Sequence, residues 1–196
     1  MMKNSKPTLS EQYFDEVYDV NTDPWNFETS VYEKDKYLVT MQALNKKTYK
    51  NVFEVGCSIG ILSEMLARRA QKLLAVDASE APLLKAKQRL NNYPNVVIKK
   101  MNVPADFINT PADLIVLSEV AYYLNNDDLE ILRKKTVQQL EKGGQLLMVH
   151  WTPFVHDYPQ TGDRVHEYFL ELKQKDLKHL LHQKYETYRL DLFEKL

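Results

Sequence analysis

The chain has a single cysteine, no long apolar run and almost no excess of either charge. Cys57 alone allows no intrachain disulfide and no cysteine zinc cluster. The longest uninterrupted apolar stretch, Val120 to Leu124, is far shorter than the ~18 residues that a membrane span needs. The first ten residues are polar and lack the apolar core of a signal peptide. These absences predict a cytoplasmic protein.

The charge balance and the composition bear on further classes of protein. Lys and Arg total 26 against 27 Asp and Glu, a formal net charge of −1. That balance gives no indication of binding to nucleic acid or to an anionic membrane. Apolar residues make up 44% of the chain and charged residues 27%, as in ordinary globular proteins. The 196 residues predict one domain with its own core.

Strand-like and helix-like segments alternate after residue 50. Helices are expected to begin near Ile61, Ser79 and Asn126, the last ending at Gly143-Gly144, and a long helix is expected over 161–184. Whether a further strand lies near residues 184–188 is left open. Short apolar runs typical of buried strands stand at 51–57, 72–78, 95–102, 112–119, 145–151 and 185–196. This alternation predicts an α/β fold with a mostly parallel sheet.

Two helices are expected before the first strand. Thr8 with Glu11, and Ser30 with Glu33, have the spacing of capping boxes. Apolar residues follow each box at helical spacing, and a loop with Pro24 and Trp25 separates the two helices. We therefore predict that residues 1–50 form a helical segment that acts as a lid on the domain of residues 51–196.

The turn after the first strand has features of a nucleotide site. Gly56 and Gly60 allow a sharp turn and the close approach of a ligand, and the next helix points its N-terminal amides there. Asp77 follows the second strand, where a carboxylate can accept hydrogen bonds from a ribose diol. Open parallel sheets bind ligands at this edge, although a plain strand-helix turn would show the same residues.

Two kinds of cofactor are candidates for binding at this turn, a dinucleotide and S-adenosylmethionine. A dinucleotide site needs Gly-x-Gly-x-x-Gly, and Ser58 stands where the second glycine should be. An S-adenosylmethionine site has no pyrophosphate to collide with Ser58, and it carries an acidic residue where Glu54 stands. The Gly143-Gly144 turn before the fifth strand also resembles methyltransferases. The residues therefore favour S-adenosylmethionine.

Several longer strings carry a more specific signal. They are Asp23-Pro-Trp25, Tyr32-Glu-x-x-Lys-Tyr37, Glu54-Val-Gly-Cys-Ser-Ile-Gly60, Ala75-Val-Asp77, Leu117-Ser-Glu-Val-Ala-Tyr-Tyr-Leu124 and His150-Trp151. Over residues 11–196 the chain resembles the nodulation protein S (NodS) family of class I S-adenosylmethionine-dependent methyltransferases. The resemblance implies a Rossmann-like three-layer sandwich with an antiparallel C-terminal strand. It also implies N-methylation of an amino sugar on a short chitin-like oligosaccharide, with S-adenosylhomocysteine as the product.

The resemblance places eleven residues around the cofactor. Asp77 would hold the ribose, Ala78 and Val103 would flank the adenine, and Asn102 would hydrogen-bond its amino group. A turn role for Asn102, a backbone cap for Ser118 and a core role for Trp25 remain open, as does a solvated face for Tyr32 and Lys36. The full set is Trp25, Tyr32, Glu54, Gly56, Ser58, Gly60, Asp77, Ala78, Asn102, Val103 and Ser118.

The acceptor side is expected to contain Glu119, His150 and Tyr123. Glu119 and His150 follow adjacent parallel strands, so both can reach one amine, as a base or as a group that holds it. His179 and His182 share a face of the predicted long helix without a nearby carboxylate, so no metal site is predicted.

Other functions stay open at this stage. A hydroxyl or carboxyl acceptor fits the same fold, and the oligomeric state is not indicated. A nicotinamide-dependent oxidoreductase or a non-catalytic nucleotide-binding module would also use such a crevice. Strand four ends in Ser-Glu-Val-Ala rather than Asn/Asp-Pro-Pro-aromatic, which disfavours methylation of adenine in nucleic acid.

Overall fold

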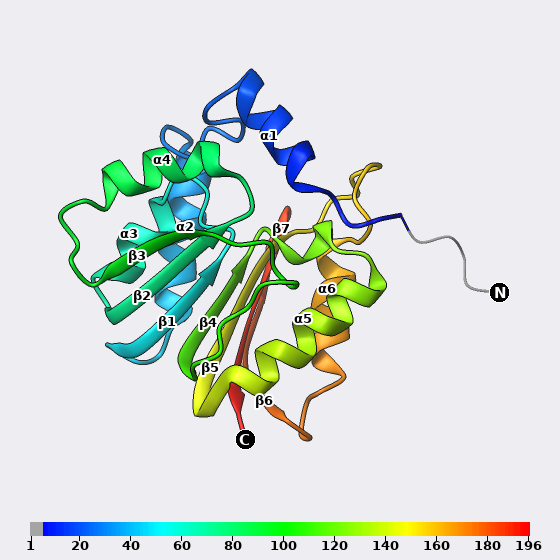
Figure 1. The fold of residues 1–196 in the computed structure, drawn as a ribbon. Helices are drawn as coiled ribbons and strands as arrows, with labels where there is room; N and C mark the ends of the chain where they lie inside the picture. Colours follow the sequence, from blue (N-terminus) through cyan, green and yellow to red (C-terminus); the bar gives the residue numbers. More distant parts are fainter. Residues whose placement is uncertain (1–5) are drawn as a thin grey trace.

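The computed structural model describes residues 6–196, so the first five residues of the predicted lid segment lie outside it. Seven strands form one sheet in the order β3-β2-β1-β4-β5-β7-β6 (Figure 1). Strands β1 to β5 are parallel, and β7 runs antiparallel to both β5 and β6. The strands are β1 Tyr49–Val55, β2 Ala70–Asp77, β3 Val96–Lys100, β4 Ala112–Ser118, β5 Leu140–Trp151, β6 Leu177–Lys184 and β7 Tyr188–Lys195.

Helices cover both faces of the sheet and complete the predicted three-layer sandwich. One buried cluster joins the sheet to α2, α3 and α4, and a second joins its other face to α5 and α6. Figure 1 shows α1 above the carboxyl ends of the strands. The helices are α1 Glu11–Val20, α2 Val31–Ala43, α3 Ile61–Ala67, α4 Glu80–Arg89, α5 Asn126–Gln139 and α6 Gly162–Leu170, with a 3-10 turn η1 at Ala121–Tyr123.

Local sequence explains where most helices begin. The Ser30 hydroxyl caps α2 by accepting from the Glu33 N–H, as its spacing predicted. The predicted Thr8 cap of α1 is wrong: Ser10 caps this helix, and the Thr8 hydroxyl bonds Asp128 instead. Pro82 lies in the first turn of α4, where its missing N–H costs little. In residues 6–196, no helix combines the length and the apolar character needed to cross a bilayer.

The predicted long helix over 161–184 is wrong. Helix α6 ends at Leu170, and Leu177 already begins β6. The sequence left open a further strand near residues 184–188, and the structure places the additional strand at residues 177–184 instead. The chain reverses through Gln174, whose φ of 68° is left-handed. This turn contains neither glycine nor proline, so the sequence shows no break between the helix and the strand that follows. His179 and His182 therefore lie on a strand.

The predicted end of α5 is also displaced. The helix ends at Gln139, and β5 begins at Leu140, so Gly143 and Gly144 lie within the strand. The register between β4 and β5 shifts beside this pair, and Gly143 has a φ of 74°. The two glycines therefore mark an irregularity inside the strand, a common reason for glycine there.

Candidate active site

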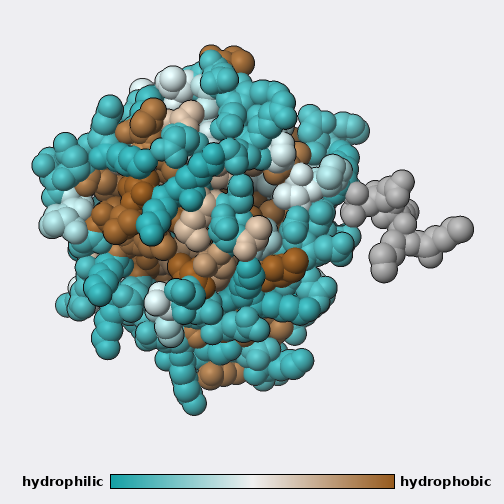
Figure 2. Space-filling model, in the orientation of Figure 1, coloured by the Kyte–Doolittle hydropathy of each residue, from teal (hydrophilic) through white to brown (hydrophobic). Residues whose placement is uncertain are grey.

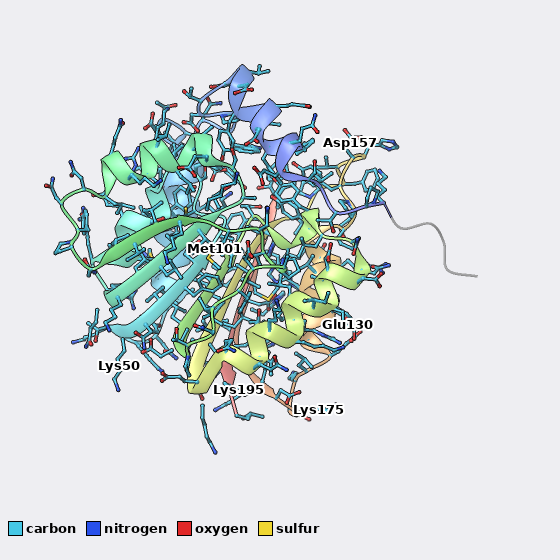
Figure 3. All side chains as sticks on the ribbon, in the orientation of Figure 1. Lys50, Met101, Glu130, Asp157, Lys175 and Lys195 are labelled. Carbon is cyan, nitrogen blue, oxygen red and sulfur yellow. The ribbon has the colours of Figure 1, made fainter. Side chains whose placement is uncertain are left out.

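One cavity of about 640 Å³ lies at the carboxyl ends of β1 to β4. This volume falls within the range of small-molecule sites, ~300–1,000 Å³. Its walls come from α1, the loop before α2, α2 itself, η1 and the segment after β5. Figure 2 shows hydrophobic residues gathered in the middle of this face, and Figure 3 labels Met101, one of the lining residues, near its centre. The sequence predicted a site at this edge.

The turn after β1 bends sharply at the cavity floor. Gly56 has a φ of 81°, and a Cβ there would lie 2.1 Å from Val120 Cγ2, so only glycine fits. Ser58 also adopts a left-handed φ, 47°, and its hydroxyl lies 2.6 Å from the Tyr18 hydroxyl. Gly60 caps α3 and packs against Ala86 without lining the cavity. Gly60 therefore has a packing role and does not face the cavity, although the resemblance placed it among the cofactor contacts.

Asp77 lies beside this turn and lines the cavity. Its Oδ2 accepts from the Ser58 N–H at 2.9 Å, and its Oδ1 accepts from the Ser79 N–H at 3.1 Å. Burial raises the pKa of this carboxyl, while the backbone donors act in the opposite direction. A carboxylate has about four acceptor positions. Two bonds therefore leave room for the two hydroxyls of a ribose.

Glu54 lies behind the turn rather than in the cavity wall. Its side chain is almost fully buried, and burial raises its pKa to about 7. The nearby Asp77 carboxylate raises the pKa further, whereas the Ser63 hydroxyl lowers it. Glu54 therefore lies beneath the turn and does not face the cavity.

Replacing Glu54 by glutamine should flatten the dependence of stability on pH. The folded protein favours the protonated carboxyl, so this group's stabilisation is complete below pH 4.5 and is lost as pH rises through about 7. Wild type should lose about 2 kcal/mol from this source between about pH 5 and 7, and Glu54→Gln should not. Urea denaturation at both values tests this. The exposed Glu186→Gln control should keep the wild-type slope; a Glu54→Gln protein that keeps it too would contradict the expectation.

The segment before β1 contributes an aromatic wall. Trp25 lines the cavity and stacks on Phe27, with ring centroids 5.5 Å apart. Tyr18 meets Trp25 edge to face at 5.7 Å. Trp25 therefore both anchors the N-terminal segment and faces the cavity, so its two predicted roles coexist. Tyr18 was not among the predicted site residues, although its position on the apolar face of α1 was a signal.

Lys36 is the only lining lysine among residues 6–196, and it is buried between two carboxylates. Its side chain is 3% exposed, so a solvated position is wrong for Lys36. Nζ lies 2.9 Å from Glu119 Oε1 and 3.0 Å from Glu33 Oε1. Burial lowers the pKa of Lys36, but the two carboxylates outweigh burial and raise it. Burial raises the pKa of Glu33 despite Lys36. The ammonium therefore stays charged.

Glu119 directly follows β4, and its side chain forms hydrogen bonds with residues of α2, η1 and β5. Its Oε2 accepts from the Tyr122 hydroxyl at 2.7 Å and from the Trp151 N–H at 2.8 Å, while Oε1 meets Lys36. The backbone holds a left-handed φ of 56°, a conformation that costs energy for a residue with a side chain. Three of about four acceptor positions are filled, so one remains for a ligand.

Three tyrosines form the wall opposite the glycine turn. Tyr122 stacks on Tyr158 with centroids 5.1 Å apart, and Tyr123 meets Tyr158 edge to face at 4.8 Å. All three line the cavity. The sequence analysis placed Tyr123 in the site. It missed Tyr158, on the segment after β5, because no motif surrounds it.

Tyr32 and the residues beyond β2 and β3 also reach the cavity. The Tyr32 hydroxyl lies 2.7 Å from Thr187 Oγ1, and its ring is 38% exposed. Asn102 lines the cavity, while its N–H donates to Asp106, so a turn role and a site position coexist. The other predicted cofactor residues that line the cavity are Ala78, Val103 and Ser118.

His150 does not reach the cavity. It is fully buried, and its Nε2 accepts from the Ala121 N–H at 3.2 Å, so the ring proton sits on Nδ1. That nitrogen lies 3.0 Å from His166 Nε2, and His166 Nδ1 lies 2.6 Å from Asp191 Oδ2. Burial lowers the pKa of both histidines. The structure therefore makes His150 a neutral support beneath η1 and removes the predicted direct contact with an acceptor.

Sequence comparison decides the family. The pattern of the family described as Nodulation protein S (NodS) matches residues 9–152, more than half of the chain. The chain belongs to the nodulation protein S family. Nodulation protein S of Azorhizobium caulinodans is 31% identical over 127 residues, which span 64% of this chain and 61% of the relative. That of Bradyrhizobium diazoefficiens is 28% identical over 105 residues, 53% of this chain and 50% of the relative. The chain thus matches only half to three fifths of these relatives.

Solved structures share the fold of this chain. N-methyltransferase NodS from Bradyrhizobium japonicum WM9, in complex with S-adenosyl-L-homocysteine, superposes with a TM-score of 0.82 at 20% identity, covering 94% of this chain and 97% of that one. A putative methyltransferase from Pseudomonas syringae gives a TM-score of 0.74 at 31% identity, covering 85% of this chain and all of that one. The fold is that of the class I methyltransferases, as predicted.

Proposed function

We propose that this chain is an S-adenosylmethionine-dependent methyltransferase that methylates the amine of a small polar acceptor. The observation that carries the proposal is the Gly56–Ser58 turn with Asp77 beside it, opening into a cavity of about 640 Å³. The NodS relative that holds S-adenosyl-L-homocysteine supports this cofactor for the present chain.

The cavity residues suit the parts of this cofactor. Asp77 has acceptor positions left for ribose hydroxyls, and Ala78, Asn102 and Val103 would surround the adenine. Gly56 and Ser58 would face the methionine part, with Glu54 orienting their turn and Ser118 near the sulfonium. Trp25 and Tyr32 close the site from the N-terminal side. In this proposal residues 6–50 act as the lid over the domain of residues 51–196.

Positioning and exclusion of water are the main tasks of the protein. When bound, a sulfonium donor would supply an activated methyl group. An acceptor that arrives as an ammonium would first lose a proton to solvent; its lone pair would then form the new N–C bond as the C–S bond breaks, sulfur would keep the electron pair, and the methylated product would leave as an ammonium. The chain's residues must align the amine on the methyl carbon and shield it from water. Glu119 would hold the amine through its remaining acceptor position, while Tyr122, Tyr123 and Tyr158 form an apolar wall.

The acceptor is proposed to be an amino sugar or a short oligosaccharide that carries one. The support is family membership, together with a cavity that combines aromatic walls with the carboxylates Glu33 and Glu119. Aromatic faces and carboxylates both attract a cationic amine. Methyl transfer to glucosamine oligomers, compared with simple amines and with hydroxyl or carboxyl acceptors, tests this finer proposal.

Replacing Asp77 by alanine should weaken cofactor binding. The ribose hydroxyls would lose a charged acceptor, which is worth roughly 1.5–3 kcal/mol, or roughly 10- to 150-fold in Kd. Calorimetric titration of S-adenosylhomocysteine measures this. Asp113→Ala is the matched control: Asp113 also accepts two backbone N–H bonds, from Lys50 and Asn51, but at the start of β1. Unchanged affinity in Asp77→Ala would place the ribose elsewhere, and thermal stabilisation by NAD alone would reject the cofactor.

A further inference from the structure

His179, His182 and Asp191 lie together on β6 and β7. Within residues 6–196 they are the one group of three possible metal ligands whose donor atoms all lie within 4.8 Å of one another. His179 Nε2 lies 2.6 Å from Asp191 Oδ1, and His182 Nδ1 lies 2.9 Å from the same oxygen. All three residues follow residue 152, where the match to the NodS family ends, and the cavity lining does not include them.

An irregularity in β6 brings the two imidazoles onto one side. Residues three apart on a regular strand point to opposite faces of the sheet. The register between β6 and β7 shifts between His179 and Leu181, as it does at a β-bulge. His182 then pairs across the strands with Asp191, and His179 reaches the same carboxylate. The sequence predicted no metal site here because it placed both histidines on a helix with no carboxylate nearby. In the structure both histidines lie on β6, and the neighbouring strand β7 brings the Asp191 carboxylate to them.

Further contacts orient the carboxylate. Asp191 Oδ2 lies 2.6 Å from His166 Nδ1 and accepts from Arg189 Nε at 2.7 Å, so Oδ1 faces the two outer histidines. Metal-binding carboxylates are commonly held in this way by a surrounding layer of donors. Arg189 also lies 2.6 Å from Glu167 and 3.5 Å from Asp163. Two more carboxylates therefore offset the guanidinium charge near the site.

We propose that His179, His182 and Asp191 bind a divalent first-row transition ion, with Zn²⁺ as the best match. Two imidazole nitrogens and one carboxylate oxygen form a three-ligand set typical of zinc, with a fourth position for water. Hard ions such as Mg²⁺ prefer oxygen ligands and should bind poorly.

The donor atoms need only small movements. Zinc bonds of ~2.0–2.1 Å in a tetrahedron place donors ~3.3 Å apart, so each histidine nitrogen must move away from Asp191 Oδ1 by less than about 1 Å. The two histidine nitrogens lie within 4.8 Å of each other. The His182 side chain is 46% exposed, which gives it freedom to turn and gives the ion a path from solvent. Each imidazole must bind through the nitrogen that faces Asp191 and carry its proton on the other ring nitrogen. For neutral rings this changes the tautomer and not the charge.

Zinc titration of the metal-free full chain tests the site without any methyl transfer. Calorimetry should show one Zn²⁺ per chain, and His182→Ala should weaken its binding at least tenfold. His156→Ala, which removes an exposed histidine after β5, should bind Zn²⁺ as wild type does. Co²⁺ in place of Zn²⁺ should give the strong visible absorption of a tetrahedral ion, and Mg²⁺ should not displace it.

Several outcomes would overturn the proposal. These are an absence of saturable zinc binding, equal zinc affinity in wild type and His182→Ala, or a loss of affinity in His156→Ala as large as in His182→Ala. Circular dichroism checks that the variants fold; His179→Gln serves as a second variant because it keeps a polar side chain beside Asp191. Since no assay here involves the cofactor, failure of this proposal and failure of the methyltransferase proposal are separate results.

Discussion

Replacing Lys36 by alanine should lower the free energy of unfolding by about 3–5 kcal/mol, the usual cost of removing one partner from a buried ion pair. Lys36 is 3% exposed, and Glu33 and Glu119 would be left facing each other across its place without a counter-charge. Alanine favours helix α2 slightly, so helix propensity does not contribute to the loss. Urea denaturation at pH 7 measures the change.

An exposed pair provides the matched control for Lys36. Lys134 and Glu130 on α5 also form a helical ion pair, but their side chains are 65% and 46% exposed. Lys134→Ala should therefore change the free energy of unfolding by less than about 1 kcal/mol. The loss in Lys36→Ala should shrink at pH 5, because burial raises the pKa of Glu33 and this carboxyl can then take up a proton. Equal, small losses in both variants would mean that the Lys36 cluster contributes little to stability.

Local patterns in the sequence were enough to predict most of the fold. The Ser30 cap, the strand cores and the Gly56 turn each depend on residues close in the chain, and the structure confirms them. The segment after α6 was misread because its reversal at Gln174 uses a left-handed residue without glycine. Pairing with β7, a long-range effect, makes residues 177–184 a strand.

The site was predictable where the strands end and not where side chains from distant elements meet. Gly56, Ser58, Asp77 and Glu119 all lie at or directly after the carboxyl end of a strand, and topology alone places them together. The partnership of Lys36 with Glu119 joins residues 83 positions apart, which spacing cannot reveal. His150 lies near the end of β5, yet its ring points into the core toward His166, for which the sequence offered no functional indication.

Replacing Glu119 by glutamine should reduce methyl transfer while leaving cofactor affinity nearly intact. Glu119 lies at the end of β4, and its one remaining acceptor position faces the proposed acceptor site. Lys36 and Tyr122 hold the Glu119 carboxylate in place, so we expect it to hold and orient the amine. The turnover number should fall roughly 10- to 100-fold, the effect of losing one hydrogen bond to a charged group. Single-turnover assays with a verified amine acceptor, and titration with S-adenosylhomocysteine, measure the two effects separately.

Glu33→Gln separates this role from the ion pair. Both substitutions remove one carboxylate from Lys36, but only Glu119 also accepts from Tyr122 and the Trp151 backbone at the end of β4. Turnover should therefore fall less than tenfold in Glu33→Gln. An equal loss in both variants would assign the effect to Lys36 and contradict a contact between Glu119 and the amine. Loss of S-adenosylhomocysteine binding in Glu119→Gln would instead make Glu119 a cofactor ligand, because an acceptor contact has no reason to change affinity for the product cofactor.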